Sequence, residues 1–310
     1  MTKNYAPQTS EMQKPNDVDI SEIFSLIWQF KVWLSIALFV SGLCSALYSL
    51  SLPNIYTSAA LMKTSDSASN DSSNSSALGS IANITGLNLS PSAGSSNKTD
   101  LAVATILSRD FLRHLIRIPT IAAKITAVQK YDSVTNEIIY DESIYDSASD
   151  AWVGSEPSYV EIYKDYIAMI DASLGKKTGF ITIEVTHQSP FVAQELLSLV
   201  IREANLLARD EDKNKSRDAL AYLTNQLDII QQKDIKLSVN QLIGVEMRKL
   251  TLANIDENYL IEAIDSPYIP HIKSAPLRAK ISIIGTVAGF VFSLFSLVIW
   301  YFLFGRDKKA

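Results

Sequence analysis

Two long segments without any charged residue constrain this 310-residue chain more than any other feature. They cover residues 32–52 and 281–304, which are 21 and 24 residues long. About 20 apolar residues in a helix span the hydrocarbon core of a bilayer. The sequence therefore predicts two transmembrane helices and argues against an ordinary soluble enzyme. The net charge of −5 also argues against a dedicated nucleic-acid binder, which needs a basic excess to neutralise phosphates.

Each segment has an alternative interpretation. The first occupies the position of a cleaved signal peptide, but 31 residues with four acidic side chains precede it, and it is longer than the usual signal core of about 7–15 residues. The second can be read as a buried core helix, but it contains Trp300-Tyr301 near its end, an aromatic pair typical of a membrane border. The only cysteine, Cys44, lies in the first segment, so we expect no intramolecular disulfide.

The basic tail at residues 305–310 predicts the topology, because short basic flanks stay in the cytoplasm. Two spans place both ends of the chain on one side, so residues 1–31 are expected to form a second cytoplasmic tail. Residues 53–280 then form a domain on the other side of the membrane. Arg278 and Lys280 precede the second span on that far side, which the rule disfavours, but long domains are translocated largely regardless of charge.

The first half of this domain alternates between ordered and polar segments. A strand is expected at residues 55–62, followed by a loop at 64–100 that contains 12 serines and five asparagines and cannot bury much apolar surface. A helix is expected to open at Asp100 and to end at Pro119. Residues 130–158 are acidic and rich in turn formers, but the spacing of a calcium loop is missing, so we predict a solvated loop there.

The second half contains the clearest strand and a long helical region. Residues 180–186 alternate between apolar and polar side chains, and Ser189-Pro190 then supplies a helix N-cap and first helical residue. Residues 190–260 keep helical spacing, yet one helix of about 105 Å cannot be retraced by residues 261–280, which span about 68 Å at most. The chain must therefore fold back, and a break at Gly244 is expected. We predict an α+β membrane protein in which two transmembrane helices flank an α/β base with a protruding helical hairpin; a strand at 259–265 rejoins the base.

Two features next to and within the second span are candidate functional positions. A stiff, extended segment with three prolines precedes the span, and a basic residue follows it; these positions are Pro267, Pro270, Pro276 and Arg278. Within the span, Gly285 and Gly289 form a small-xxx-small pattern that lets helices approach closely. The partner of this glycine face is left open between a sister subunit, the chain's own first span and another membrane protein, and glycine simply tolerated in a membrane helix is an equally good explanation.

No motif in the sequence predicts catalysis. The patterns of a phosphate-binding loop, a zinc protease and a serine hydrolase are absent, and the three histidines are far apart. The two spans contain no ionisable residue that would mark a substrate path. We therefore expect a protein that is not an enzyme and that has no catalytic residues, metal site or cofactor.

The ordered set of features resembles the Wzz-type polysaccharide chain-length determinants, which belong to the polysaccharide co-polymerases of Gram-negative bacteria. The resemblance begins at residues 17–23 (DVDISEI) and continues through 107–111 (LSRDF) and 183–190 (IEVTHQSP). It is strongest at 216–223 (SRDALAYL) and 249–253 (KLTLA), and it extends to the prolines before the second span. Lys273 and Leu277 interrupt the denser run of prolines that the family usually has.

The resemblance implies a place, a task and a set of partners. The place is the inner membrane, with the large domain in the periplasm. The task is to set the modal chain length of O-antigen lipopolysaccharide or a similar surface glycan. The implied partners are further copies of the chain in a ring-like homo-oligomer, a membrane glycan polymerase, the growing glycan and the bilayer. Because the sequence has no long extension after residue 304, the resemblance implies the class without a kinase domain.

Two other function classes fit the topology. One is a polysaccharide export adaptor coupled to an ABC transporter, which the neighbouring genes would distinguish from a co-polymerase. The other is a receptor that signals across the membrane, for which the six residues at 305–310 offer no output domain.

Overall fold

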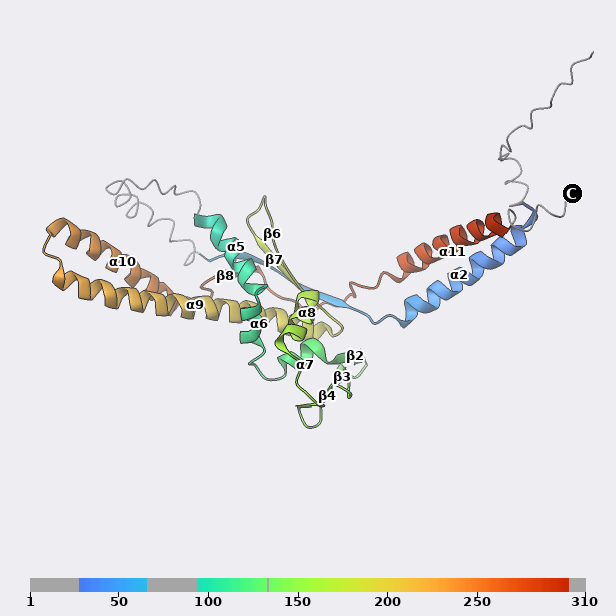
Figure 1. Cartoon of the computed structure of the whole chain (residues 1–310), viewed down its shortest axis with the longest axis horizontal. Coiled ribbons are helices and arrows are strands. Elements are labelled where there is room, and N and C mark those ends of the chain that lie inside the picture. The colour runs from blue at the N-terminus through green and yellow to red at the C-terminus, as the bar shows by residue number, and fades with distance from the viewer. Residues whose placement is uncertain (1–27, 66–93, 133, 301–310) are drawn as a thin grey trace, which may run out of the picture. The chain divides into compact units, whose positions relative to one another are not determined.

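The computed structural model describes residues 28–65, 94–132 and 134–300, and these residues belong to two compact units (Figure 1). One unit contains helices α2 (Lys31–Ser51) and α11 (Arg278–Trp300), and the other comprises residues 53–275. Both helices are long and apolar enough to cross a membrane, judged by length and composition. Helix α11 begins at Arg278 and not at Ile281, so Lys280 lies in its first turn. Several expected segments lie wholly or partly outside the described residues: positions 1–27 of the tail at 1–31, positions 66–93 of the loop at 64–100, positions 301–304 of the second span, and the tail at 305–310.

A four-stranded antiparallel sheet forms the centre of the larger unit. Its strands are β1 (Tyr56–Thr64), β6 (Ile170–Leu174), β7 (Ile181–His187) and β8 (Ile261–Asp265), in the order β6-β7-β1-β8. Burial alternates strictly along β7, as its sequence predicted. The strand expected at 259–265 is present as β8, at one edge of the sheet.

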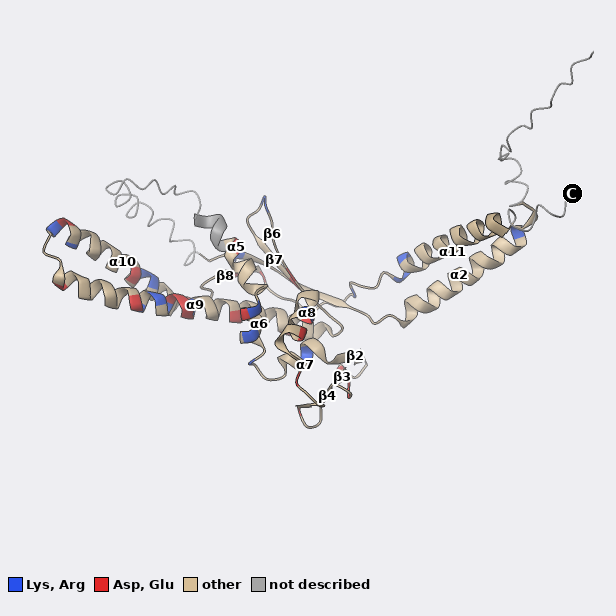
Figure 2. Ribbon diagram, viewed as in Figure 1, with Lys and Arg blue, Asp and Glu red and all other residues tan. Residues whose placement is uncertain are grey.

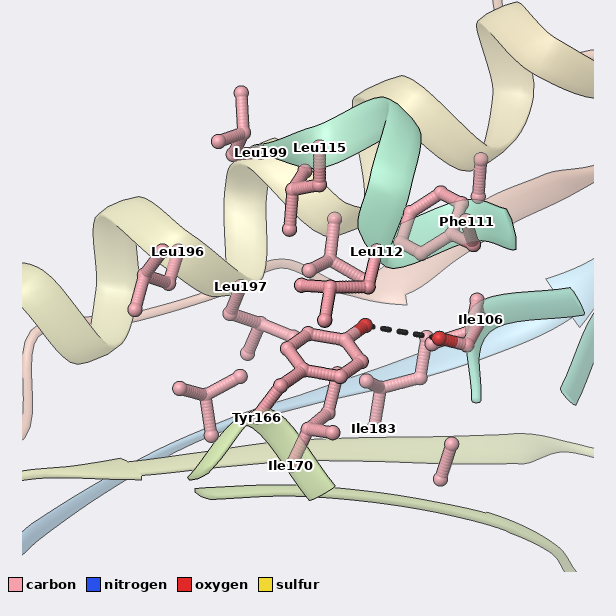
Figure 3. Packing of buried hydrophobic residues seen from close by; sticks show 14 of the residues in the cluster. Ile106, Phe111, Leu112, Leu115, Tyr166, Ile170, Ile183, Leu196, Leu197 and Leu199 are labelled. Atoms are coloured by element: carbon pink, nitrogen blue, oxygen red, sulfur yellow. Dashed lines mark hydrogen bonds between the residues drawn. The ribbon is translucent and has the colours of Figure 1, made fainter. Parts of the chain in front are cut away.

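Helices pack against the buried side chains of this sheet (Figure 3). They are α5 (Gly94–Ile106), α6 (Arg109–Leu115), α7 (Ile121–Thr126), α8 (Tyr159–Met169) and the first half of α9 (Pro190–Ile229). Large core side chains such as Phe111, Leu112 and Leu197 are completely buried. Tyr166 is also buried, and its hydroxyl donates to the carbonyl oxygen of Ile106 at 2.9 Å, which satisfies the phenol inside the core.

The helix expected between residues 100 and 119 differs from the observed structure. Helix α5 starts earlier, at Gly94, and the chain interrupts the helix before it starts α6. The interruption occurs at Ser108, whose hydroxyl accepts from the backbone N–H of Phe111 at 3.1 Å. A serine that caps a new helix in this way competes with continuation of the previous one.

The acidic segment at 130–158 contains more structure than a solvated loop. It forms two short antiparallel hairpins, one of β2 (Val128–Asp132) and β3 (Glu137–Tyr140) and one of β4 (Tyr145–Asp146) and β5 (Ala151–Trp152). Several acidic side chains hold the turns: Asp141 accepts from the Ser143 N–H at 3.0 Å, and Asp146 accepts from the Ala148 N–H at 2.9 Å. The carboxylates thus act as local turn acceptors, a use that composition alone does not reveal.

The long helical region folds back at Ile230–Gln232, so the expected break at Gly244 is wrong. Helix α9 ends at Ile229, α10 (Lys233–Ile255) follows, and the two helices pack side by side. Gly244 lies inside α10. Val239, in the first half of α10, is buried in the observed structure. The pairing of α10 with α9 therefore decides the position of the turn, and one flexible residue does not.

Polar contacts also join α9 and α10. The Ser216 hydroxyl donates to Glu246 at 2.8 Å, and Lys249 pairs with Asp212 at 3.3 Å. Ser216 is fully buried. These contacts specify one pairing of the two helices, because shifting either helix by one residue would separate the partners.

Candidate functional site in the apolar helix pair and the proline segment

The two glycines singled out in the sequence lie on the face of α11 that contacts α2. A Cβ atom built on Gly285 would overlap the side chain of Ser45, and one built on Gly289 would overlap the side chain of Ser41. On the opposite helix, a Cβ on Gly42 would lie 3.2 Å from the Thr286 hydroxyl. The structure thus places the glycine face against the chain's own first apolar helix, at a separation that only very small residues allow.

Serines of α2 complete this contact, and sequence reasoning missed them. The Ser45 hydroxyl donates to the carbonyl oxygen of Ile281 at 3.1 Å, and the Ser49 hydroxyl donates to that of Arg278 at 3.4 Å. Ser49 is almost fully buried although most residues of α2 are exposed. The signal was available in the sequence, because Ser41, Ser45 and Ser49 are spaced by four and therefore share one helix face.

Large aromatic side chains, and not small residues, meet where α2 begins and α11 ends. There the Phe30 and Trp300 rings meet edge to face with centroids 5.9 Å apart, beside an apolar groove of about 640 Å³. Most other large side chains point outward, including Phe39, which is 72% exposed, and Phe292, which is 76% exposed. Figure 2 shows that the described charges of α2 and α11 are confined to the helix starts. An exterior of this kind is suited to lipid, and the close interface is the small-residue face.

The proline segment lies along the start of β1 in the larger unit. The Ser58 hydroxyl donates to the carbonyl oxygen of Tyr268 at 2.7 Å, between Pro267 and Pro270. Of these prolines, Pro270 is buried and Pro267 is half-buried. Backbone bonds then join the segment to Ile55, which donates to Ala275 at 2.8 Å and accepts from Ser274 at 2.8 Å and from Ala275 at 3.3 Å. The segment bends at residues 271–272 and is held by hydrogen bonds on both sides of Pro270.

The remaining candidate positions lie at the start of α11. The Arg278 N–H donates to the carbonyl oxygen of Pro276 at 2.9 Å, and the Arg278 carbonyl accepts the Ser49 hydroxyl. Pro276 and Arg278 belong to the helix-pair unit, whereas Pro267 and Pro270 belong to the larger unit. The structure therefore groups Gly285, Gly289 and Arg278 at one helix interface and places the two earlier prolines in the sheet domain.

The three histidines do not form a site together. His114 contacts Glu203 at 3.0 Å in a partly buried pair, His271 is exposed, and His187 is buried at the end of β7. Burial lowers the pKa of His187 below its usual value of 6.5, and its Nδ1 accepts from the Ser189 N–H at 2.9 Å. Within the described parts of the chain, no group of three His, Cys, Asp or Glu side chains is arranged to hold a metal ion.

Comparison with known proteins gives a family match for the N-terminal third of the chain. Residues 16–117 match the family model of the Wzz chain length determinant proteins. This region includes α2, β1, α5 and α6. The search of curated proteins gave no match.

Two solved structures are similar to the chain at low sequence identity. A full-length bacterial polysaccharide co-polymerase is 12% identical, with 94% of this chain and 98% of that chain covered and a TM-score of 0.39. A fragment of WzzB, a polysaccharide co-polymerase from Salmonella Typhimurium, is also 12% identical, with 72% and 100% covered and a TM-score of 0.33. The family match over residues 16–117 agrees with the resemblance found in the sequence.

Proposed function

We propose that this protein is a non-enzymatic regulator of the chain length of a surface polysaccharide, acting as a co-polymerase in the bacterial inner membrane. The observation that carries the proposal is the match of residues 16–117 to the chain length determinant family. The glycan is O-antigen lipopolysaccharide or a similar polymer, and the protein acts with the polymerase that makes it.

The two apolar helices support the membrane part of this proposal. They bracket the sheet domain in the sequence, and their outward-facing apolar side chains favour a lipid environment. We assign both ends of the chain to the cytoplasm and residues 53–280 to the periplasm, in agreement with the basic residues Arg306, Lys308 and Lys309. A reporter active only in the periplasm should be silent after Ala310 and active when inserted near Ser95; the reverse pattern would refute this topology.

Assembly of several copies is also part of the proposal. Helices α9 and α10 form a two-helix arm, which cannot bury apolar side chains on its outer faces; Tyr222, for example, is 64% exposed and Ile229 70% exposed. Further copies of the chain, arranged in a ring, would cover such positions. The size of the purified protein in detergent, measured by light scattering, tests this part.

The main experiment is deletion of the gene followed by gel separation of the surface polysaccharide. We expect the strain to keep making polymer but to lose the clustering of chain lengths around one mode, and the intact gene on a plasmid should restore it. A complete stop of synthesis would contradict a regulatory role. Full-length polymer retained inside the cell would instead indicate an export adaptor.

A further inference from the structure

Two arginines of α6 lie over two tyrosines of α8. The guanidinium carbon of Arg109 is 5.4 Å from the ring centroid of Tyr163, and that of Arg113 is 4.7 Å from the centroid of Tyr159. Both pairs of residues are spaced by four along their helices, so the two stacks lie one after the other. We refer to these four side chains as the Arg–Tyr ladder.

The protein core holds the ladder from beneath. The Tyr163 hydroxyl donates to the carbonyl oxygen of Leu107 at 2.9 Å, which fixes the ring on which Arg109 lies. The adjacent side chains of both helices, Phe111 on α6 and Ile162 on α8, are completely buried. The Tyr163 ring is therefore held in place by its hydrogen bond, and both helices of the ladder are anchored in the core.

An arginine over an aromatic ring can still offer hydrogen-bond donors to a ligand. When a guanidinium group lies flat on a ring, its five N–H donors point outward in its own plane. The described residues give Arg109 no carboxylate partner. Arg113 makes one ion pair, with Asp110 at 3.2 Å, in which the Asp110 side chain is 88% exposed. An ion pair so open to water contributes little, at most about 1 kcal/mol, so another anion can compete for it.

Two further arginines belong to the same region of the fold. Arg117 follows Arg113 by four residues, and Arg202 on the neighbouring helix α9 is exposed. The nearby acids are largely occupied: Glu203 pairs with both His114 and Arg202, at 3.0 and 3.1 Å. Glu161, in the first turn of α8, accepts from the Ser158 N–H at 3.0 Å. Arginines and carboxylates thus alternate around the ladder, and the carboxylates of Glu203 and Glu161 already have hydrogen-bond partners.

We propose that the Arg–Tyr ladder binds carboxylate groups of an acidic polysaccharide. Arginine pairs with carboxylates through two parallel hydrogen bonds, and the exposed edges of Arg109 and Arg113 offer that geometry. Residues four apart on a helix lie about 6 Å apart along its axis, so two arginines can meet charges that repeat along a polymer. The choice of a polysaccharide over other anions rests on the proposed function, which brings such a polymer to this domain.

The test is a binding titration on the full-length protein in detergent. The probe is a hexamer of galacturonic acid, with a neutral glucose hexamer as the control ligand, measured by calorimetry. We expect the acidic hexamer to bind and the neutral one not to bind. The double variant R109Q/R113Q should weaken binding at least about tenfold, since each charged hydrogen bond is removed.

Two further variants separate recognition from charge and from folding. R217Q/R248Q removes two exposed arginines from α9 and α10, changes the net charge equally and should bind as the original protein does. R109K/R113K keeps both cations on their rings but loses the paired donors, so it should stay folded by circular dichroism and still bind severalfold more weakly. Equal weakening by R217Q/R248Q, undiminished binding by the lysine variant, or binding of the neutral hexamer would each overturn the proposal.

Other anions provide the remaining comparison. Inorganic phosphate and phosphatidylglycerol in mixed detergent micelles are titrated in the same way, and tighter ladder-dependent binding of the lipid than of the acidic hexamer would assign the ladder to lipid and refute the glycan proposal. The deletion experiment is independent of this one. Altered chain lengths in the deletion strain without hexamer binding would refute only the proposal for the ladder. Hexamer binding without altered chain lengths would instead refute the proposed function.

Discussion

The side chain of Ser45 occupies the space that a Cβ atom on Gly285 would need. The two residues lie on opposite helices and are far apart in the sequence, so each explains why the other is small. Ser45 also donates to the Ile281 carbonyl, one turn before Gly285. Close packing and a hydrogen bond therefore coincide at one point of the helix pair. The effects of substitutions at Ser45 and Gly285 on the stability of the pair should therefore be coupled.

We expect Gly285→Ser to weaken the helix pair and the exchange Gly285→Ser with Ser45→Gly to restore much of it. The single change introduces a Cβ where Ser45 already lies, at an expected cost of about 1 kcal/mol or more. The double change moves the side chain to the other helix. Thermal unfolding in detergent, analysed as a double-mutant cycle, measures the coupling between the positions. Strictly additive effects of the two changes would contradict the contact.

Replacing both Gly285 and Gly289 with leucine should shift the modal glycan length while the sheet domain stays folded. Two bulky residues would hold α11 away from Ser45 and Ser41 on α2. The matched control is Val291→Leu, at a position that is 57% exposed on the same helix. Glycan length and protein level are measured together. An unchanged length at a normal protein level in the double leucine variant would show that this packing has no part in length control.

Acidification should destabilise the sheet domain through His187. Burial lowers its folded pKa below the unfolded value of 6.5, so as the pH falls through 6.5 the unfolded state takes up a proton that the folded state refuses. The neutral Nδ1 accepts from the Ser189 N–H, a bond that protonation would break. The stability that the neutral His187 contributes to the sheet domain is therefore fully present above pH 6.5 and is lost as the pH falls below this value.

His187→Asn tests this dependence, because the asparagine oxygen can accept from the same N–H without a titration. The variant should be less stable at pH 7.5 and lose less stability between pH 7.5 and 5.5 than the original protein, in thermal unfolding. His271→Asn, at an exposed histidine, should leave the pH dependence unchanged. Parallel curves for the original protein and His187→Asn would exclude His187 as the source.

Asn205→Leu should strongly destabilise the sheet domain. The buried Asn205 side chain accepts from the N–H groups of Leu260 and Ile261 at 2.8 and 2.9 Å and donates to the Ile261 carbonyl at 2.9 Å. Leucine would leave these backbone groups buried without partners, each at a cost of about 1–3 kcal/mol. Faster hydrogen exchange at Leu260 and Ile261 would report the loss, whereas Asn254→Leu, at an exposed site, should change little.

Gly244→Ala should stabilise α10. The glycine lies inside the helix, its backbone is not in the positive-φ region, and a Cβ there would meet no atom within 4 Å. Alanine in a helix interior is favoured over glycine by about 1 kcal/mol. Thermal unfolding should show a higher midpoint. A lower midpoint would mean that Gly244 is needed for a bend, as its sequence position first suggested.

The sequence was most informative where one residue pattern determines a local structure without help from distant parts of the chain. The alternation at 180–186 predicted β7, and Ser189-Pro190 predicted the start of α9; both are confirmed. The two uncharged segments predicted α2 and α11 for the same reason. Each of these patterns reports burial or capping within a few residues.

The sequence-based predictions failed or stayed open where contacts between distant parts of the chain determine the structure. The turn at 230–232 is set by the pairing of α10 with α9, and the most flexible residue, Gly244, was a misleading guide to it. The partner of Gly285 was left open because nothing in its own segment identifies Ser45. The Arg–Tyr ladder combines residues 109–113 with 159–163, and only the folded core aligns them.

The backbone pairing of Ile55 with Ala275 has a consequence for how the protein can change over evolutionary time. The larger unit, residues 53–275, begins and ends at this pairing, so its two ends lie next to each other. A domain whose ends meet can be inserted into a loop without forcing that loop apart. The sheet domain is therefore an insertion between two helices. A domain of another shape can replace it while the residues that pack the two helices together, such as Gly285 and Ser45, stay the same.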